Sequence, residues 1–146
     1  MIELKVVNKS NNPNPEYAHP GDSGLDIRAN IENEITLQPL ERTLIPTGIY
    51  LGIPEGYEVQ VRPRSGLALK RGLTVLNTPG TIDQGYKNEI GVIMINLSNE
   101  PQTIIPGEKI AQLVVMAVER AVLDPVLFLD IDSERGLDGY GSTGRV

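Results

Sequence analysis

The sequence predicts an all-β protein with a single domain. Its 146 residues include 15 glycines and 11 prolines, which divide the chain into short segments. Within these segments the apolar side chains recur at every second position more often than at the period of a helix, which is the pattern of half-buried strands. Many short strands separated by turn signals are typical of a sandwich, a jelly roll or a barrel. A chain of this length is also about the size of one domain.

The expected strands are, in chain order, residues 2–7, 34–37, 42–45, 48–53, 58–62, 73–76, 90–97, 102–105 and 110–118. Residues 65–71 predict the only helix, of at most two turns, because no other segment is both long and periodic enough. Residues 8–24 are rich in Asn, Pro and Gly and predict a surface loop. Residues 76–91 predict a long hairpin. Residues 132–146 contain four glycines and little to bury, so they predict a mobile tail.

The composition excludes several classes of function. Without cysteine the chain has no disulfide, no thiolate nucleophile and no Cys-ligated metal, and it suits a reducing compartment, so we expect a cytoplasmic protein. The single histidine, His19, cannot form a two-histidine site, so any metal would be a hard, oxygen-bound ion such as Mg²⁺. A net charge of −6 disfavours long nucleic acid. Neither a signal peptide nor a membrane partner is expected, because the first residues alternate apolar with polar and no apolar run is long enough to span a bilayer.

Residues 62–72, RPRSGLALKRG, contain four cationic side chains and no acidic one. Arg64, Ser65 and Gly66 stand where the expected strand gives way to the expected helix. A guanidinium, a hydroxyl and a glycine amide placed together form a cradle for phosphate oxygens. A basic surface turn is the alternative interpretation of this segment taken alone.

Residues 77–91, NTPGTIDQGYKNEIG, place Asp83 between Ile82 and Tyr86. A carboxylate held partly desolvated at the edge of a pocket is suited to act as a base for water. Asp in a hairpin is also a common turn former, so this segment alone leaves both roles open.

Three further features each have both a functional and a structural interpretation. Asp26 begins an apolar alternation after two glycines; it could order water around Mg²⁺ or hold an arginine, or it could cap a loop. Gln112 is the one neutral polar residue in an apolar strand, and is either a satisfied core amide or a ligand donor. The tail could wrap an anion and stack on a base, or be disordered without a function. Its candidate residues are Arg135, Tyr140, Gly141, Ser142 and Thr143.

Taken together and in this order, the five segments resemble the five motifs of the trimeric dUTP diphosphatase (dUTPase) family. The resemblance extends from residue 20 to residue 144, and it is carried by the strings RPRSGLALK, GTID followed by Tyr86, IAQLVV and GSTG. It implies a β jelly roll that forms a homotrimer with active sites shared between subunits. It also implies hydrolysis of dUTP to dUMP and diphosphate with Mg²⁺, which removes dUTP from the nucleotide pool and supplies dUMP for thymidylate synthesis.

The resemblance implies a role for each matched residue. Asp83 would align and activate the water that attacks the α-phosphorus, and Tyr86 would pack under the deoxyribose. The residues that would read the uracil edge are Asn77 and the backbone of Gly80, Thr81, Ile82 and Asp83.

A neighbouring subunit would supply the phosphate ligands, which are Arg64, Ser65, Gly66 and Gln112. Asp26 would act through water or through an arginine rather than as a direct metal ligand. The residues Arg135, Tyr140, Gly141, Ser142 and Thr143 would belong to an arm, residues 132–146, that closes over nucleotide bound to the domain of residues 1–131.

Two rival hypotheses share this fold: a dCTP deaminase-like enzyme and a non-catalytic nucleotide-binding regulator. The segment with Asp83 and Tyr86 argues against the first, and the presence of Asp83 argues against the second. Four positions depart from the usual family pattern. Tyr140 stands where phenylalanine is common and Asp138 where glycine is common, while Asn88 replaces a frequent glycine and Gly91 a frequent longer side chain.

Overall fold

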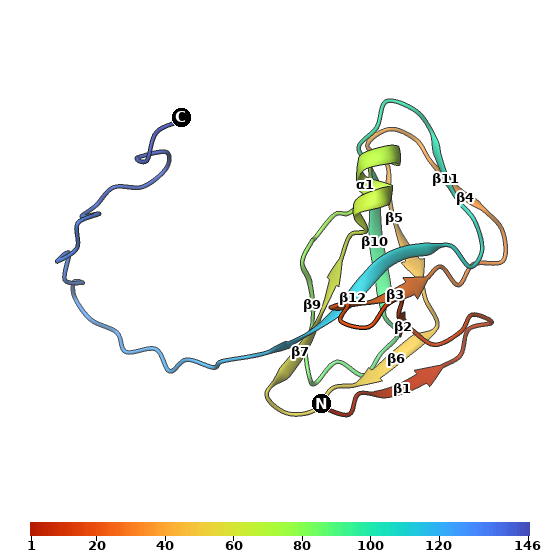
Figure 1. The fold of residues 1–146 in the computed structure, drawn as a ribbon, viewed down its shortest axis with the longest axis horizontal. Helices are drawn as coiled ribbons and strands as arrows, with labels where there is room; N and C mark the ends of the chain where they lie inside the picture. The colour runs from red at the N-terminus through yellow and green to blue at the C-terminus, as the bar shows by residue number, and fades with distance from the viewer.

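The computed structural model describes residues 1–146 and shows a body of twelve strands and one short helix (Figure 1). The strands form one sheet of five strands, one of three and two of two, and all strand pairs are antiparallel. This architecture is a β jelly roll, which confirms the all-β prediction.

The largest sheet has the order β2 (Glu16–Tyr17), β3 (Gly24–Arg28), β12 (Lys109–Ala117), β7 (Tyr57–Arg62) and β9 (Gly80–Ile82). Strand β12 is the longest, with nine residues, and lies at the centre of this sheet. Its pairing places Asp26 of β3 and Arg62 of β7 opposite Gln112. Cross-strand partners share a face of a sheet, so these polar residues lie on one face.

The other strands form smaller sheets. The three-stranded sheet has the order β5 (Arg42–Pro46), β10 (Gly91–Asn96) and β8 (Leu73–Val75). The two-stranded sheets pair β1 (Lys5–Asn8) with β6 (Ile49–Gly52) and β4 (Ile35–Leu37) with β11 (Gln102–Ile104).

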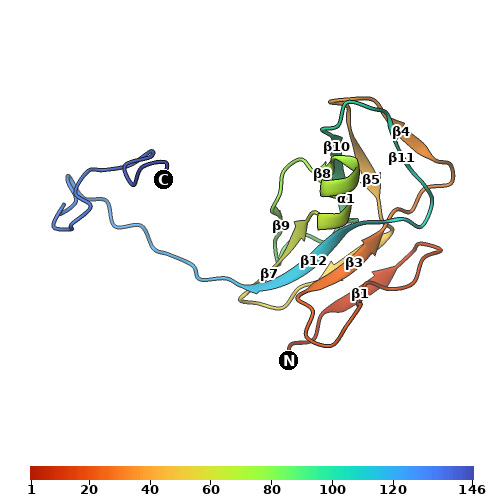
Figure 2. The same cartoon turned by 45° about the horizontal axis from the view of Figure 1, so that its top comes forward.

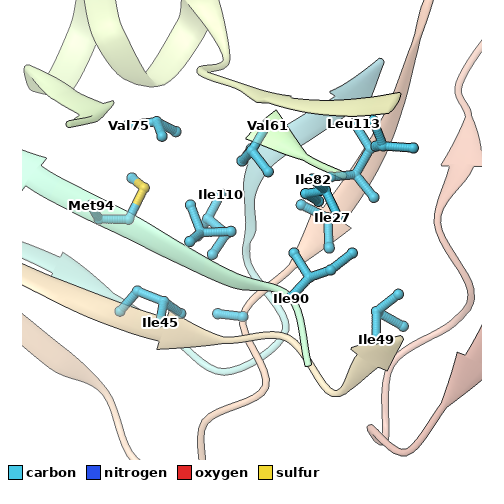
Figure 3. Packing of buried hydrophobic residues seen from close by; sticks show 14 of the residues in the cluster. Ile27, Ile45, Ile49, Val61, Val75, Ile82, Ile90, Met94, Ile110 and Leu113 are labelled. Atoms are coloured by element: carbon cyan, nitrogen blue, oxygen red, sulfur yellow. The ribbon is translucent and has the colours of Figure 1, made fainter. Parts of the chain in front are cut away.

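One hydrophobic core joins the sheets. It contains 19 buried residues, among them Ile27 and Leu113 from the five-stranded sheet and Ile45 and Met94 from the three-stranded sheet (Figure 3). The buried Asn96 is satisfied because its Nδ2 donates to the carbonyl oxygens of Leu37 and Glu100. No buried side-chain nitrogen or oxygen lacks a hydrogen-bond partner.

Helix α1 (Ser65–Arg71) follows β7 and leads into β8, beside which it lies (Figures 1 and 2). It ends at Gly72, which adopts the left-handed conformation with φ 63° and donates its N–H to the carbonyl of Ala68. Arg71 fastens this end to the neighbouring strand, because its guanidinium donates to Gln102, the carbonyl of Thr103 and the carboxylate of Glu108. The helix has seven residues, so the structure contains no helix that could span a bilayer.

The predicted helix and the nine predicted strands are all present, with ends that differ by up to three residues. Three strands were missed. β2 has two residues and lies in the expected surface loop, β3 has five residues and begins at the last residue of that loop, and β9 has three residues within the expected hairpin. The expected long hairpin is wrong in part: β8 and β10 pair as predicted, but between them β9 leaves to pair with β7 in the other sheet.

The chain leaves the body after β12. Val118 N–H donates to the carbonyl of Gly56, and no later residue makes a hydrogen bond to the body. Figures 1 and 2 both show the following segment extending away from the sheets. Large apolar side chains of this segment are exposed, and they include Val122, Leu123, Leu127, Phe128 and Leu129.

The core predicts the stability of one variant. Leu113 is fully buried at the centre of the five-stranded sheet, so Leu113→Ala removes packed atoms and leaves a cavity. We expect a loss of about 2–5 kcal/mol in the free energy of unfolding, measured by urea denaturation followed by far-UV circular dichroism. Leu137→Ala is the matched control, because Leu137 is exposed in the tail. Equal losses in the two variants would contradict the described core.

Candidate functional site

Apart from Asp83, the predicted site residues of the body line two pockets. The first has a volume of about 660 Å³ and is lined by Asn77, Gly80, Thr81, Ile82 and Tyr86, together with residues of β5, β8 and β10. The second has a volume of about 530 Å³ and is lined by Asp26, Arg64, Ser65, Gly66 and Gln112, together with Lys70 and Arg71. No residue lines both pockets.

The first pocket depends on the close approach of β9 to β7. Gly80 lies opposite Val61, and a Cβ atom on Gly80 would come within 3.3 Å of both Val61 Cβ and Asn77 Nδ2. Glycine therefore lets Asn77 lie against the strand. Buried apolar side chains, including Ile82 and Ile90, form much of the wall. This pocket suits a flat, partly apolar ring with polar edges.

A tight turn follows β9 and fixes the rim of the first pocket. Tyr86 N–H donates to the carbonyl of Asp83 at 3.0 Å, and Tyr86 Oη donates to the carbonyl of Glu89 at 2.7 Å. Glu89 is held in turn, since its Oε1 accepts the N–H of Gly48 at 2.7 Å. Tyr86 is thus tethered at both its backbone and its hydroxyl, with its ring at the pocket.

Asp83 is the first residue after β9 and is exposed. Its carboxylate makes no ion pair within the chain and does not line either pocket. The expectation of a partly desolvated carboxylate is therefore not met in the single chain. The physical reason is that the turn projects beyond the strand, where no other part of the same chain covers it.

The second pocket is cationic and polar. Ser65 and Gly66 begin α1, and Arg64 precedes them. Arg64 Nε lies 3.2 Å from Asp26 Oδ1, so the acid contacts the arginine directly. Gln112 Nε2 donates to the carbonyl of Pro63 at 3.0 Å, which ties the amide to the turn that carries Arg64.

The position of the Gln112 amide requires glycine on the adjacent strand. A Cβ atom on Gly24 would lie 2.0 Å from Gln112 Oε1, which is an overlap. One of the two glycines that precede Asp26 thus makes room for a side chain of β12.

Sequence reasoning missed residues that line these pockets or contact a residue that does. Lys109 is the most consequential: it does not line the second pocket, but its Nζ lies 2.7 Å from Oδ2 of the pocket residue Asp26. Leu44 reaches the first pocket from β5, and its Cδ1 occupies the space where a Cβ atom on Gly91 would lie, at 2.5 Å. No local signal identifies these contacts, because both depend on strand pairing between distant segments.

The tail residues lie in neither pocket. Arg135, Tyr140, Gly141, Ser142 and Thr143 make hydrogen bonds only within the tail or none. Tyr140 is fully exposed. Three groups of predicted residues are therefore separate in the single chain: the first pocket with Asp83 at its border, the second pocket, and the tail.

The body offers no cluster of protein ligands for a metal. No group of three or more His, Cys, Asp or Glu residues lies close enough together to hold an ion. The second pocket has two acids: Asp26 is already paired with two cations, and Asp22 accepts the backbone N–H of His19. The other polar groups of its lining are hydroxyls, amides and cations, which bind anions better than they bind metals.

Comparison with known proteins identifies the family. The dUTPase family model matches residues 10–144. The deoxyuridine 5'-triphosphate nucleotidohydrolase of Finegoldia magna is 52% identical over 143 residues, covering 98% of this chain and 99% of that protein. The dUTPase of Staphylococcus bacteriophage 80alpha, solved as a mutant with dUpNHpp, is 29% identical with a TM-score of 0.86, over 99% of this chain and 100% of that one.

A further solved structure concerns a metal. A mutant dUTPase from phage phi11 of S. aureus, described with a coordinated structural Mg(II) ion, is 27% identical with a TM-score of 0.77, over 88% of this chain and 99% of that one. The match of the family model to almost the whole sequence, together with close relatives of the same length, shows that the chain belongs to the dUTPase family.

Proposed function

We propose that the protein hydrolyses dUTP to dUMP and diphosphate, through attack on the α-phosphorus by a water molecule that Asp83 activates. The observation that carries this proposal is the division of the site into a partly apolar pocket bordered by Asp83 and a cationic pocket. A nucleoside triphosphate has a nucleoside for the partly apolar pocket and a phosphate chain for the cationic pocket. The relatives are named deoxyuridine 5'-triphosphate nucleotidohydrolases, which supports hydrolysis of dUTP.

The first pocket is assigned to deoxyuridine. β9 is an edge strand, paired only with β7, so its outer backbone N–H and C=O groups are free to bond to the polar edge of uracil. Asn77 and residues Gly80 to Asp83 supply this edge. The tethered ring of Tyr86 packs under the sugar, where a 2′-hydroxyl would be crowded.

The second pocket is assigned to the phosphates. Arg64, Ser65, Gly66 and Gln112 offer charged and neutral donors for phosphate oxygens. No residue lines both pockets of one chain, which is compatible with a site that joins the phosphate pocket of one subunit to the nucleoside pocket of another, as the family resemblance implies. We therefore propose a homotrimer with shared sites. The exposed apolar side chains after β12, such as Leu127 and Phe128, support an assembly that covers them.

Mg²⁺ is assigned to the nucleotide. The chain lacks a carboxylate cluster, so the residues fit an ion held by phosphate oxygens and water, with Asp26 acting at most through a water molecule. Bound in that way, the ion would neutralise charge on the triphosphate and favour departure of diphosphate. Arg64 would complement it by holding phosphate oxygens directly.

The chemical step uses Asp83 as a general base. Its carboxylate has no ion-pair partner in the chain and is therefore available to accept a proton. The water oxygen forms a bond to the α-phosphorus as the bond from that phosphorus to the bridging oxygen breaks. The proton passes to Asp83, and the electron pair of the broken bond leaves with diphosphate. Positioning and charge stabilisation supply most of the rate enhancement for such a transfer.

The tail is proposed as a lid. It carries Arg135, Ser142 and Thr143 as phosphate donors and Tyr140 as a stacking face, and it lies away from the body in the free chain. The positive φ of Gly141, 87°, allows a turn that other residues rarely adopt. We further propose that the domain of residues 1–131 folds without the arm of residues 132–146, and that the protein is cytoplasmic. The dCTP deaminase and regulator alternatives are not favoured by the family match.

Substrate selectivity tests the assignment of the first pocket. With Mg²⁺ we expect dUTP to release diphosphate while dTTP, dCTP and UTP are poor substrates, because in the proposed binding mode a 5-methyl group would meet β9 and a 2′-hydroxyl would meet the ring of Tyr86. Diphosphate and ammonia are both measured, since ammonia from dCTP would indicate a deaminase. Chelation of Mg²⁺ should stop turnover. Comparable release from dTTP or UTP would contradict the proposal.

Asp83→Asn tests the base. The amide keeps the shape of the side chain but cannot accept the proton, so we expect kcat to fall roughly 10²–10⁴-fold while a non-hydrolysable dUTP analogue still binds. Glu32→Gln is the control, because Glu32 is an exposed acid that lines neither pocket. Normal turnover in Asp83→Asn would show that another group activates the water.

Removal of residues 132–146 tests the lid. These residues make no hydrogen bond to the body, so the thermal midpoint should change little while activity falls sharply. Tyr140→Phe should retain activity because the ring face is preserved, and Tyr140→Ala should lose roughly 1–3 kcal/mol of stacking. Amide hydrogen exchange should slow in the tail when the dUTP analogue binds with Mg²⁺. A truncated chain with full turnover would exclude a lid.

A further inference from the structure

Asp26 contacts two cations at once. Arg64 Nε lies 3.2 Å from one carboxylate oxygen, and Lys109 Nζ lies 2.7 Å from the other. The side chain of Asp26 is 14% exposed, against 36% for Arg64 and 28% for Lys109. The acid is therefore the most buried of the three groups, and the arginine is the one most open to solvent and to a ligand.

A bulge in β12 brings Lys109 to this acid. The register with β3 shifts between Lys109 and Ala111, so that Ile110 is the extra residue and both Ile110 and Ala111 are buried. In an unbroken strand Lys109 and Gln112 would point to opposite faces. The bulge places them on the same face, beside Asp26, and bulges commonly redirect side chains in this way near functional sites.

Asp26, Arg64 and Lys109 together have a net charge of +1, because one carboxylate is shared by two cations. Arg64 is therefore less tightly committed to Asp26 than it would be in a simple pair. If Arg64 turns toward a phosphate, Asp26 keeps one partner and is not left as a buried, unpaired charge. Leaving such a charge unpaired is costly.

We propose that Lys109 is a positioning residue for the phosphate pocket, which keeps Asp26 neutralised while Arg64 moves from the acid to a phosphate oxygen. The proposal rests on the proposed function, in that it takes the second pocket as the phosphate site. Lys109 acts through Asp26 and Arg64, and it is not assigned a contact with the nucleotide. Its Nζ is already engaged by Asp26 Oδ2.

Lys109→Met tests this role with two readouts. We expect the Kd of a non-hydrolysable dUTP analogue and the KM for dUTP to rise about tenfold, equivalent to 1.4 kcal/mol, with kcat changed little. Binding of deoxyuridine, which has no phosphate, should be unchanged. Lys109→Arg should restore values near those of the unmodified chain. If Lys109→Met does not fold, as judged by circular dichroism, Lys109→Gln takes its place.

A second substitution separates action through Asp26 from a general loss of positive charge. In an Asp26→Asn background no carboxylate needs a partner, so Lys109→Met should have no further effect on the analogue's Kd. An equal tenfold loss of analogue affinity from Lys109→Met in the Asp26 and the Asp26→Asn backgrounds would overturn the proposal. So would an unchanged Kd in Lys109→Met, or a fall in its kcat and thermal midpoint without a change in Kd. Failure of the proposed function is distinguishable, because the unmodified chain itself would then bind no triphosphate.

Discussion

The pairing of β12 with β3 on one side and β7 on the other is the constraint on which the rest of the structure depends. This strand contributes Leu113 to the core on one face and Gln112 to the second pocket on the other. Antiparallel pairing across it sets the distance between the segment that carries Asp26 and the turn that carries Arg64. The same sheet carries β9 at one edge, so the rim of the first pocket is held in a fixed position relative to β12.

In the second pocket, partly buried polar side chains are positioned by partners from the same chain. Around Asp26 the chain places two cations, and around Gln112 it places a carbonyl partner and a glycine that leaves space. Every buried side-chain nitrogen and oxygen has a hydrogen-bond partner, so these groups keep defined orientations before any ligand arrives. Asp83 is the contrast, since its exposed carboxylate is held in place only through its backbone.

The sequence predicts most of the body because alternation is a local signal. The nine strands recognised from it, and the helix between β7 and β8, are present in the structure. The strands that were missed are short and border loops: β2 has two residues, β9 three and β3 five. Local motifs also identified residues of both pockets. Lys109 could not be found this way, because its position depends on a bulge defined by pairing with β3.

The disjoint lining of the two pockets has a consequence for mixed populations of chains. If each working site joins a nucleoside pocket from one subunit to a phosphate pocket from another, a substitution in one chain inactivates only the sites to which its altered pocket contributes. Two inactive chains, one lacking the Asp83 carboxylate and one lacking the Arg64 guanidinium, would then regenerate some intact sites when they assemble together. Genetic complementation between such alleles would then follow, because the residues of the nucleoside pocket and those of the phosphate pocket would come from different subunits at each site.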